Sequence, residues 1–581
     1  MYFLAIFIVL NLSSFAACKD DHPVATYFGR MLSNGKLLNR NSDDYDKDIK
    51  KPFVNHILAS DTTASLKVLQ NNIKNGGKVT VLWNNVEKVQ PKDFIAFYCP
   101  AFDNPNHYLD YFYVTQSPDW NTGNGKHTVK VYNMRSTCVF KYYRAGGTYS
   151  QLVAVSQEIY FNDGGFLAPL QGHIAMTTKP TEMRVMWNSG EVHQPTVVKY
   201  GASKDLPLSE YETIVHTYTA DSMCMSPANS TGFWHPGFTY DVLLKDLKPN
   251  TQYYYSYGTK GHMSRVNNFT TPLLVGDQTS YKFIIYGDMG VDPYPEAVTT
   301  AKLISKEINN NDIRFIFHNG DISYARGYAY IWEQWFYLIE PYATLVPYMV
   351  GLGNHEQDHT SGGVKDPSHA PGEGGFRPSW FNGGDDSGGE CGVPMYKRFH
   401  MPDNGNAVWW YSYDFGLVHF IMMSTEHDYS PGSRQYKWLE NDLRNVNRSL
   451  TPWVIIGGHR AMYCSESIKS DYIVSVNMQR LFEDLLYKYR VDLAFWAHYH
   501  AYERTCKLYK GKCTEDGILH LIVGTGGKDV DADVWYDKDW SIFRSNDYGY
   551  GRVTVSNYSA ILFEWIQNRS KKVVDSVWLL K

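Results

Sequence analysis

Polar side chains that could bind metal ions follow five short apolar runs in the second half of the chain. The runs are FIIY (283–286), RFIF (314–317), YMVGL (348–352), WVII (453–456) and LAFW (493–496). The side chains that follow them are, in chain order, Asp288, Asp321 with Tyr324, Asn354, His459, and His498 with His500. Because ligands of open α/β sheets bind beyond the carboxyl ends of the strands, we expect these seven side chains to meet at one edge.

The types of these residues favour two metal ions over one. Two carboxylates, a phenol, an amide and three imidazoles suit iron, zinc or manganese better than calcium or a sulfur-bound metal. Seven ligands are too many for one tetrahedral site, but one bridging carboxylate and three further ligands for each ion would use them all. Ions bridged in this way lie roughly 3.5–4 Å apart. We predict that Asp321 is the bridge and that Tyr324 binds one of the bridged ions.

Two sequence patterns describe the elements that must position these residues. From about residue 50 to 270, short alternating runs separated by Gly, Pro, Asn and Asp predict strands, and their spacing indicates two sandwich-like modules that join near 161–169. After TTPLLVGDQTS (270–280), continuous apolar runs alternate with helical periodicity, which is typical of a mostly parallel sheet covered by helices. Core-facing helices are predicted at 435–446 and 476–489, where apolar residues recur every three or four positions.

These patterns predict a multidomain fold, with N-terminal β-sandwich domains followed by an α/β domain. We expect a β-rich domain at 17–165, a second sandwich, of the fibronectin III type, at 166–273, and the α/β domain at 278–581. Residues 1–16 contain an apolar stretch that ends in Ser14-Phe15-Ala16, which predicts a signal peptide cleaved after Ala16. The alternative for this stretch is a buried helix.

Composition limits the partners of the chain. The net charge is −5 over 581 residues, with no long run of Lys or Arg, which argues against nucleic acid or an anionic membrane as the main partner. After the N-terminal stretch, no segment approaches the roughly 20 apolar residues that span a bilayer, so we expect no membrane anchor. The sequence predicts entry into the secretory pathway and sets no oligomeric state.

Glycosylation and disulfide bonds would both fit a secreted protein. Sequons for N-linked glycans occur at Asn229, Asn268, Asn447, Asn557 and Asn568. The eight cysteines form no C-x-x-C pair, so zinc ribbons and thioredoxin-type chemistry fit poorly, and disulfides are expected instead. We predict that Cys506 pairs with Cys513.

The five strand-end blocks resemble those of a known family. GDMG (287–290), GDISYA (320–325), GNHE (353–356), GGHR (457–460) and AHYHAYER (497–504) are similar to the signature blocks of the metallophosphoesterases. The tyrosine in the second block is typical of purple acid phosphatases. The resemblance extends from about residue 75 to the C-terminus and looks closest to the large, plant-type members. It implies that 278–581 is a calcineurin-like domain of sandwiched β-sheets flanked by helices.

The resemblance also implies roles for individual residues. It implies that Fe(III) is held by Asp288, Asp321, Tyr324 and His500. It implies that a divalent zinc, manganese or iron ion is held by Asp321, Asn354, His459 and His498. The purple colour of the family would come from charge transfer between Tyr324 and the ferric ion. His355 corresponds to an outer-sphere histidine that contacts the substrate phosphate.

The function implied is that of an acid phosphatase acting on small phosphate monoesters, with a metal-bound hydroxide as the nucleophile. The implied location is extracellular, lysosomal or vacuolar. One departure concerns the leaving group: some relatives carry a histidine pair soon after the ligand at His459, but RAMYCSESIKSDY (460–472) contains none. Protonation of the leaving group therefore falls to His355 or to a group that the sequence does not identify.

Two other functions stay open at this point. A phosphodiesterase or nucleotide pyrophosphatase could use the same scaffold, although Tyr324 argues against it, because diesterase relatives usually have another residue there. A secreted binding protein with an inert catalytic domain is the second alternative, although all seven ligand positions carry competent residues. The Gly- and Pro-rich segment 360–394 could be a substrate-shaping lid or a surface excursion, and His359 and His369 receive no role.

Overall fold

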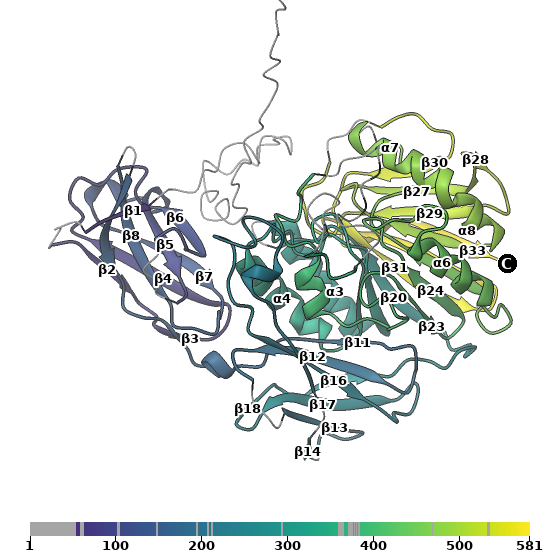
Figure 1. The fold of residues 1–581 in the computed structure, drawn as a ribbon, viewed down its shortest axis with the longest axis horizontal. Helices are drawn as coiled ribbons and strands as arrows, with labels where there is room; N and C mark the ends of the chain where they lie inside the picture. Colours follow the sequence, from purple (N-terminus) through teal and green to yellow (C-terminus); the bar gives the residue numbers. More distant parts are fainter. Residues whose placement is uncertain are drawn as a thin grey trace, which may run out of the picture.

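A computed structural model describes residues 54–58 and 63–581, except 101–104, 147–148, 193–195, 206–207, 211–212, 292–293, 358–364, 370–375, 377, 379, 381–383, 467–468 and 532–534. The predicted signal peptide and Cys18 lie outside these residues. Figure 1 shows two β-sandwiches, in purple and blue, beside a larger region that contains two sheets and most of the helices.

The first sandwich pairs a five-stranded sheet with a three-stranded one. Their strand orders are β1-β9-β8-β5-β6 and β2-β4-β7. The bounds are β1 Val54–Leu58, β2 Ser65–Val68, β4 Gly77–Asn84, β5 Phe94–Tyr98, β6 Asp110–Tyr113, β7 Gly125–Val131, β8 Val139–Gly146 and β9 Tyr149–Val155, with a parallel pair of β3 Asn72–Ile73 and β10 Tyr160–Phe161. Strand β4 shows why it forms: Val79, Val81 and Trp83 alternate with less buried residues and fill the core between the sheets.

The second sandwich consists of two sheets. Their strand orders are β11-β12-β16-β15 and β14-β13-β17-β18, and β19 pairs with β17 in the second sheet. The bounds are β11 Leu170–Ala175, β12 Met183–Ser189, β13 Thr196–Gly201, β14 Leu208–Glu210, β15 Ile214–His216, β16 Phe238–Leu244, β17 Gln252–Thr259, β18 His262–Met263 and β19 Asn267–Thr270. Its core stacks Trp187 on Tyr240, with ring centroids 5.1 Å apart. The turn-rich segment at 161–169 connects β10 to β11, as its composition predicts.

The third region contains two mixed sheets, as the family resemblance implies, whereas the apolar runs alone predict one mostly parallel sheet. One has the order β22-β21-β20-β31-β32-β33, and the other β23-β24-β25-β26-β29-β27-β28 with β30 on β27. The bounds are β20 Tyr281–Tyr286, β21 Ile313–His318, β22 Tyr348–Val350, β23 Tyr411–Phe415, β24 Val418–Met422, β25 Trp453–Gly457, β26 Leu493–Trp496, β27 Tyr502–Tyr509, β28 Lys512–Cys513, β29 Ile518–Val523, β30 Ser541–Ser545, β31 Gly549–Asn557, β32 Ala560–Gln567 and β33 Lys572–Leu580.

Parallel pairing occupies one end of the first sheet and the centre of the second. Strands β20, β21 and β22 are parallel to one another, as are β24, β25, β26 and β29. Strands buried on both faces read as continuous apolar runs, and the two sheets bury one face against each other. Phe283 of β20 meets Phe420 of β24 edge to face at 5.3 Å between ring centroids, so the two sheets are in direct contact.

Helices cover the outer faces of both sheets. Their bounds are α3 Pro295–Asn310, α4 Ala329–Ala343, α5 Val393–Arg398, α6 Arg434–Asn445, α7 Lys469–Met478 and α8 Asp484–Lys488. Helices α3 and α4 share a core with β20 and β21, whereas α6, α7 and α8 share one with β25 and β26. The predicted helices at 435–446 and 476–489 are confirmed, and a π-helical turn at Gln479–Glu483 joins α7 to α8.

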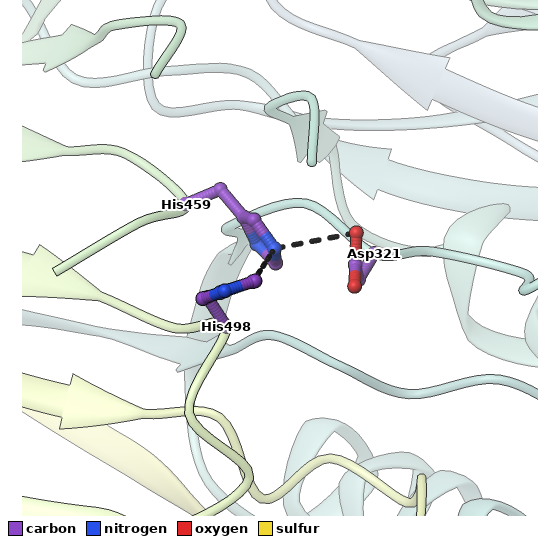
Figure 2. Close-up of side chains that lie close together, drawn as sticks. All are labelled: Asp321, His459 and His498. Carbon is purple, nitrogen blue, oxygen red and sulfur yellow. Dashed lines mark hydrogen bonds and ion pairs between the residues drawn. The ribbon is translucent and has the colours of Figure 1, made fainter. Parts of the chain in front are cut away.

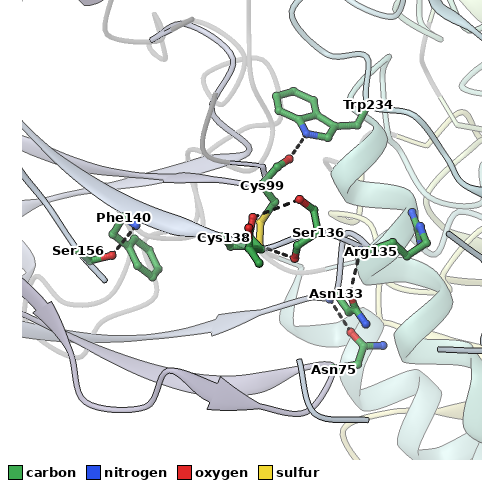
Figure 3. The surroundings of a disulfide bond; sticks show 10 residues. Asn75, Cys99, Asn133, Arg135, Ser136, Cys138, Phe140, Ser156 and Trp234 are labelled. Carbon is green, nitrogen blue, oxygen red and sulfur yellow. Dashed lines mark hydrogen bonds between the residues drawn. A yellow bond between two sulfur atoms is a disulfide. The ribbon is translucent and has the colours of Figure 1, made fainter. Parts of the chain in front are cut away.

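Three disulfides link described cysteines, and they confirm the expectation for an oxidised chain. Cys506 pairs with Cys513 as predicted, and the other bridges are Cys99–Cys138 and Cys224–Cys391. The Cys99–Cys138 bridge lies close to the second sandwich, because the indole nitrogen of Trp234 donates to the carbonyl oxygen of Cys99 (Figure 3). Cys464 is a buried free thiol. None of the described helices is both long and apolar enough to cross a membrane.

Candidate metal centre

The five predicted strand ends converge where the two large sheets meet. Strands β20, β21 and β22 of one sheet lead to Asp288, to Asp321 with Tyr324, and to Asn354, while β25 and β26 of the other lead to His459 and to His498 with His500. Donor atoms of Asp321, His459 and His498 lie within 4.8 Å of one another, and so do those of Asp288, Asp321 and His500. Figure 2 shows the first group. Asp321 belongs to both groups, which is the arrangement that a bridging carboxylate requires.

The first group has its donor atoms at the spacing expected around one ion. His459 Nε2 lies 3.0 Å from Asn354 Oδ1, 3.2 Å from His498 Nδ1 and 3.3 Å from Asp321 Oδ1. Metal–ligand bonds of about 2.0–2.2 Å in a tetrahedral site place donor atoms at about such separations. The other nitrogen of His459, Nδ1, donates to the carbonyl oxygen of Asn319 at 2.9 Å, so Nε2 is the nitrogen that faces Asn354 and Asp321.

The second group is equally close. The hydroxyl of Tyr324 lies 3.1 Å from Asp288 Oδ1 and 2.9 Å from His500 Nε2, which is 3.5 Å from Asp288 Oδ1. His500 Nδ1 donates to the carbonyl oxygen of Asp529 at 2.7 Å, which leaves Nε2 to face the carboxylate and the phenol. In both groups, therefore, a backbone carbonyl oxygen accepts from one ring nitrogen of a histidine and fixes the orientation of the other.

Unusual backbone geometry brings these side chains together. Asp288, Asp321, Tyr324 and His498 all have positive φ, at 57°, 49°, 54° and 72°. Side chains are uncommon in this left-handed region, and strained residues of this kind cluster at functional sites. Gly353 is needed because the carboxylate of Asp321 approaches it closely: a Cβ at this position would lie 2.1 Å from Asp321 Oδ1.

Glu356 is a positioning residue that we did not predict. Its buried carboxylate accepts from the backbone nitrogens of Asp321, Ile322 and Gly353 at 2.8, 2.8 and 3.0 Å. These bonds hold the turn after β21 against the turn after β22. The available signal was its place in the GNHE block, next to Asn354 and His355.

Electrostatics in the first group favour a cation. Burial opposes an ionised carboxylate at Asp321, but His459, His355 and His498 outweigh it and hold the pKa of Asp321 well below its usual range. Burial likewise opposes a charged His459, but the carboxylates of Asp321 and Asp288 raise its pKa to about 10. The arrangement therefore attracts positive charge to His459 Nε2, whether a proton or a metal ion, and the donor set fits a metal ion.

Tyr324 has a phenol whose ionisation the surroundings oppose. Burial, and then the carboxylates of Asp288 and Asp321, raise the pKa of Tyr324 well above its usual range. A phenolate would form here only if a positive charge replaced its proton. Burial also opposes a charged His500, but the carboxylates of Asp531 and Asp288 outweigh it and raise the pKa of His500 to about 9.

His498 carries its proton on the nitrogen that faces the first group. The guanidinium of Arg460 lies 3.0 Å from His498 Nε2, and because a guanidinium only donates, Nε2 accepts and Nδ1 donates to Asn354 Oδ1 at 3.0 Å. A metal ion at Nδ1 would replace this proton. The guanidinium is itself held in place, because Nε of Arg460 donates to the two carboxylate oxygens of Glu426 at 3.0 and 3.2 Å.

His355 lies beside both groups. Its ring centroid is 4.3 Å from that of Tyr324, and its Nε2 is 3.7 Å from Asp321 Oδ2. Burial lowers the pKa of His355 well below its usual range although Asp321 opposes this, and Arg326 and Lys528 lower it further. Nδ1 of His355 donates to the carbonyl oxygen of Asp386 at 3.0 Å, so Nε2 is the nitrogen that faces the ligand groups.

The predicted sequons differ in accessibility. Asn229, Asn447 and Asn557 are exposed and Asn268 is half-buried. Asn568 is only 2 % exposed, and its amide nitrogen donates to Thr300 Oγ1 at 2.7 Å and Glu296 Oε2 at 3.2 Å. The folded chain therefore offers no free nitrogen at Asn568, and we withdraw this residue as a glycan site. His369 is exposed on the described part of 360–394, and His359 lies outside the described residues.

Comparison with known proteins agrees with the geometry. The chain matches three family descriptions: the purple acid phosphatase N-terminal domain at 169–271, calcineurin-like phosphoesterase at 281–502, and the iron/zinc purple acid phosphatase-like C-terminal domain at 517–576. The solved structure of the purple acid phosphatase PPD1 from yellow lupin (Lupinus luteus) seeds is similar, with a TM-score of 0.78 and 28 % identity over 89 % of this chain and 96 % of that one.

Two curated relatives are similar in sequence. "Probable inactive purple acid phosphatase 9" of Arabidopsis thaliana is 32 % identical over 89 % of this chain and 86 % of its own. "Nucleotide pyrophosphatase/phosphodiesterase" of Hordeum vulgare is 34 % identical over 53 % of this chain and 85 % of its own. Similarity to the Arabidopsis protein over most of both chains, together with the shared carboxylate between two ligand groups, means that the chain belongs to the purple acid phosphatase family.

Proposed function

We propose that the protein hydrolyses phosphate monoesters at a centre of Fe(III) and a divalent zinc, manganese or iron ion. The ferric ion would be held by Asp288, Asp321, Tyr324 and His500, and the divalent ion by Asp321, Asn354, His459 and His498. The observation that carries this proposal is that one carboxylate, Asp321, belongs to both of the close ligand groups.

When bound, the ions would supply positive charge for the oxygens of a substrate phosphate and would lower the pKa of water for attack on phosphorus. The chain itself supplies orientation and proton transfer. Nε2 of His355 lies 3.7 Å from Asp321 Oδ2, so it would be within reach of a phosphate at the centre, and Nδ1 is held by the carbonyl oxygen of Asp386. Once a substrate phosphate donates or shares a proton with Nε2, His355 could return it to the leaving oxygen.

A metal analysis combined with one visible spectrum and two substrates tests this function. We expect about two metal ions per chain, one of them iron, a visible band from Tyr324, and faster hydrolysis of 4-nitrophenyl phosphate than of bis(4-nitrophenyl) phosphate. Hydrolysis should also be measured over a series of pH values. We expect activity in mild acid, and a loss of activity at lower pH, where acid protonates the imidazoles that would bind metal. Protein with no iron and no visible band would overturn the proposal.

A second candidate is the reaction named for the barley relative, which cleaves phosphodiesters or nucleotide pyrophosphates. It would use the same ions and the same ligands. A higher rate with the bis ester or with a nucleotide anhydride than with 4-nitrophenyl phosphate would favour it.

The name of the Arabidopsis relative raises the third candidate, a protein that binds metal without turnover. All seven ligand side chains and His355 are present and close together here, which supports activity. A purple protein with two ions that leaves both test esters intact would favour the inactive alternative.

The route and the domain limits also remain proposals. We propose that residues 1–16 are a signal peptide, that the mature chain is extracellular, lysosomal or vacuolar, and that Asn229, Asn268, Asn447 and Asn557 can carry glycans. We further propose domain limits at 17–165, 166–273 and 278–581. N-terminal sequencing and glycopeptide mass spectrometry of protein from a eukaryotic host would test the first three statements.

A further inference from the structure

We propose that Asp386 is a positioning residue for the divalent half of the centre, and that a disulfide-linked segment of the second sandwich holds it in place. The inference rests on the proposed function, because it concerns the ion that Asn354 would help to bind. It adds a residue outside the five strand-end blocks and gives the second sandwich a part in the site.

Asp386 determines which end of the Asn354 amide faces the ligand group. Asn354 Nδ2 donates to Asp386 Oδ2 at 2.9 Å, and this bond turns Oδ1 towards His459 Nε2 and His498 Nδ1, each 3.0 Å away. Only the oxygen of an amide can bind a cation, because the nitrogen donates and has no available lone pair. Without the acceptor at Asp386, the Asn354 amide could also adopt the flipped orientation, in which its nitrogen faces the ion and cannot bind it.

The same residue orients the histidine that follows. The carbonyl oxygen of Asp386 accepts from His355 Nδ1 at 3.0 Å, which points His355 Nε2 towards Asp321 Oδ2, 3.7 Å away. Asp386 therefore sets the orientation of two consecutive side chains, one through its carboxylate and the other through its backbone. Neither contact would form if the segment around Asp386 moved away from the turn after β22.

That segment is held by backbone bonds to the second sandwich. The backbone nitrogens of Cys224 and Ala228 donate to the carbonyl oxygens of Gly389 and Gly388 at 2.9 and 3.1 Å. A few residues further on, Cys391 is bonded to Cys224. The segment 384–391 thus has its far side fixed to the segment 224–228, while its near side presents Asp386 to Asn354 and His355.

Close packing supports the same attachment. Gly388 has a φ of 60°, and a Cβ there would lie 2.1 Å from the carbonyl oxygen of Arg326, in the loop that also contains Tyr324. Gly389, with a φ of 85°, would place a Cβ 2.4 Å from the carbonyl oxygen of Met225. The two glycines allow the segment to lie directly between the tyrosine loop and the second sandwich.

Variants of Asp386 test the proposal through metal content and colour. The protein is loaded with iron and zinc, and iron and zinc per chain are measured with the visible band and with a zinc titration. We expect Asp386→Ala to keep the iron and the band but to bind zinc roughly 10- to 100-fold more weakly, the usual cost of losing an outer-shell partner. Asp386→Asn, which still offers an oxygen to Asn354, should recover most of the affinity.

The control is Asp403→Ala, which removes a carboxylate that accepts from the backbone nitrogen of Gly405 in an exposed turn. It should bind both ions as the parent does. Unchanged zinc affinity in Asp386→Ala would overturn the inference while leaving the proposed function intact. A parent protein that binds no zinc and shows no band would overturn both, and loss of iron and zinc together in Asp386→Ala would show a general structural role in place of the selective one.

A second pair of variants tests the attachment. Cys224→Ser with Cys391→Ser opens the bridge without changing Asp386, and Cys506→Ser with Cys513→Ser opens a bridge on the β27–β28 hairpin as a matched control. We expect the first pair to weaken zinc binding several-fold with the visible band retained, and the second pair to leave zinc binding unchanged. Equal zinc affinity in the two paired variants would contradict the role of the second sandwich.

Discussion

At the scale of single residues, the centre depends on Asp321. Its carboxylate belongs to both ligand groups, and its pKa is held well below the usual range by His459, His355 and His498 against the effect of burial. Substituting Asn keeps the shape but removes the charge that two cations would share. We expect Asp321→Asn to lose nearly all turnover of 4-nitrophenyl phosphate and both metal ions, measured by elemental analysis. A fully active Asn variant would rule out the bridge.

Tyr324 gives a separate optical test. The phenol is buried beside Asp288 and His500, and its pKa is well above the usual range, so it would ionise only on a cation. We expect Tyr324→Phe to abolish the visible band while the far-ultraviolet circular dichroism stays that of the parent. A Phe variant that remains purple would contradict the assignment of the colour to this residue.

The sequence identifies the ligand residues better than the residues that orient them. Each of the seven predicted ligands follows an apolar run within a few residues, so its place near a strand end can be read from the chain. Asp386, Asn319 and Arg460 act on ligands through contacts between distant segments, and no local pattern predicts those contacts. Glu356 is intermediate, because it lies in a recognisable block but its three backbone partners appear only in the fold.

At the scale of elements, a pH-sensitive contact joins the β23–β24 hairpin to α6. His419 of β24 lies 2.7 Å from Asp414 of β23 and 2.8 Å from Asp442 of α6. Burial opposes its charge, but the two carboxylates raise the pKa of His419 to about 9 from its usual 6.5. Since the folded-state pKa is the higher one, the charged contact stabilises the fold fully below pH 6.5, and this stabilisation is lost as pH rises towards 9.

We expect this loss to be at most about 3 kcal/mol of unfolding free energy, reduced by solvent screening at the partly exposed Asp414. Urea unfolding below pH 6.5 and near pH 9 measures it in the parent and in His419→Gln. The parent should lose more stability over this range than the variant. An identical pH dependence in the two proteins would exclude His419 as its source.

The sequence predicted whether a segment is a helix or a strand where one apolar pattern was repeated. It did not predict which strands pair with one another. The three-and-four spacing of 435–446 and 476–489 predicted α6 and the helical segment from α7 to α8, but not its π-helical turn. The apolar runs of β20, β21, β25 and β26 look alike, because each is buried on both faces, so nothing local assigned them to two different sheets. The antiparallel strands β31, β32 and β33 add to one of those sheets from the far end of the chain.

At the scale of the whole molecule, one buried carboxylate of α4 joins all three regions. Glu333 accepts from Arg135 of the first sandwich at 2.6 and 2.8 Å and from Gln171 of the second at 2.6 Å, and Arg398 lies 3.8 Å away. Removing the carboxylate would leave a buried guanidinium without its charge partner. We expect Glu333→Gln to cost roughly 3–5 kcal/mol of unfolding free energy, measured by chemical denaturation.

The matched control is Glu182→Gln, which breaks a surface pair whose lysine, Lys179, is 67 % exposed. Surface pairs contribute about 0–1 kcal/mol, so this variant should unfold as the parent does. Equal losses in the two variants would contradict a special role for Glu333. No sequence pattern predicted this contact, because Arg135 and Glu333 are 198 positions apart.

The two ligand groups take their side chains from both large sheets, and this has a mechanical consequence. Cations held between Asp321 on one side and His459, His498 and His500 on the other would fasten the two halves of the sandwich at one rim. Ligands that bind only the folded state raise its stability by an amount that grows with the logarithm of ligand concentration relative to Kd. A chelator would therefore act as a denaturant as well as an inhibitor, lowering the melting temperature and loosening the rim at which β21 and β25 end.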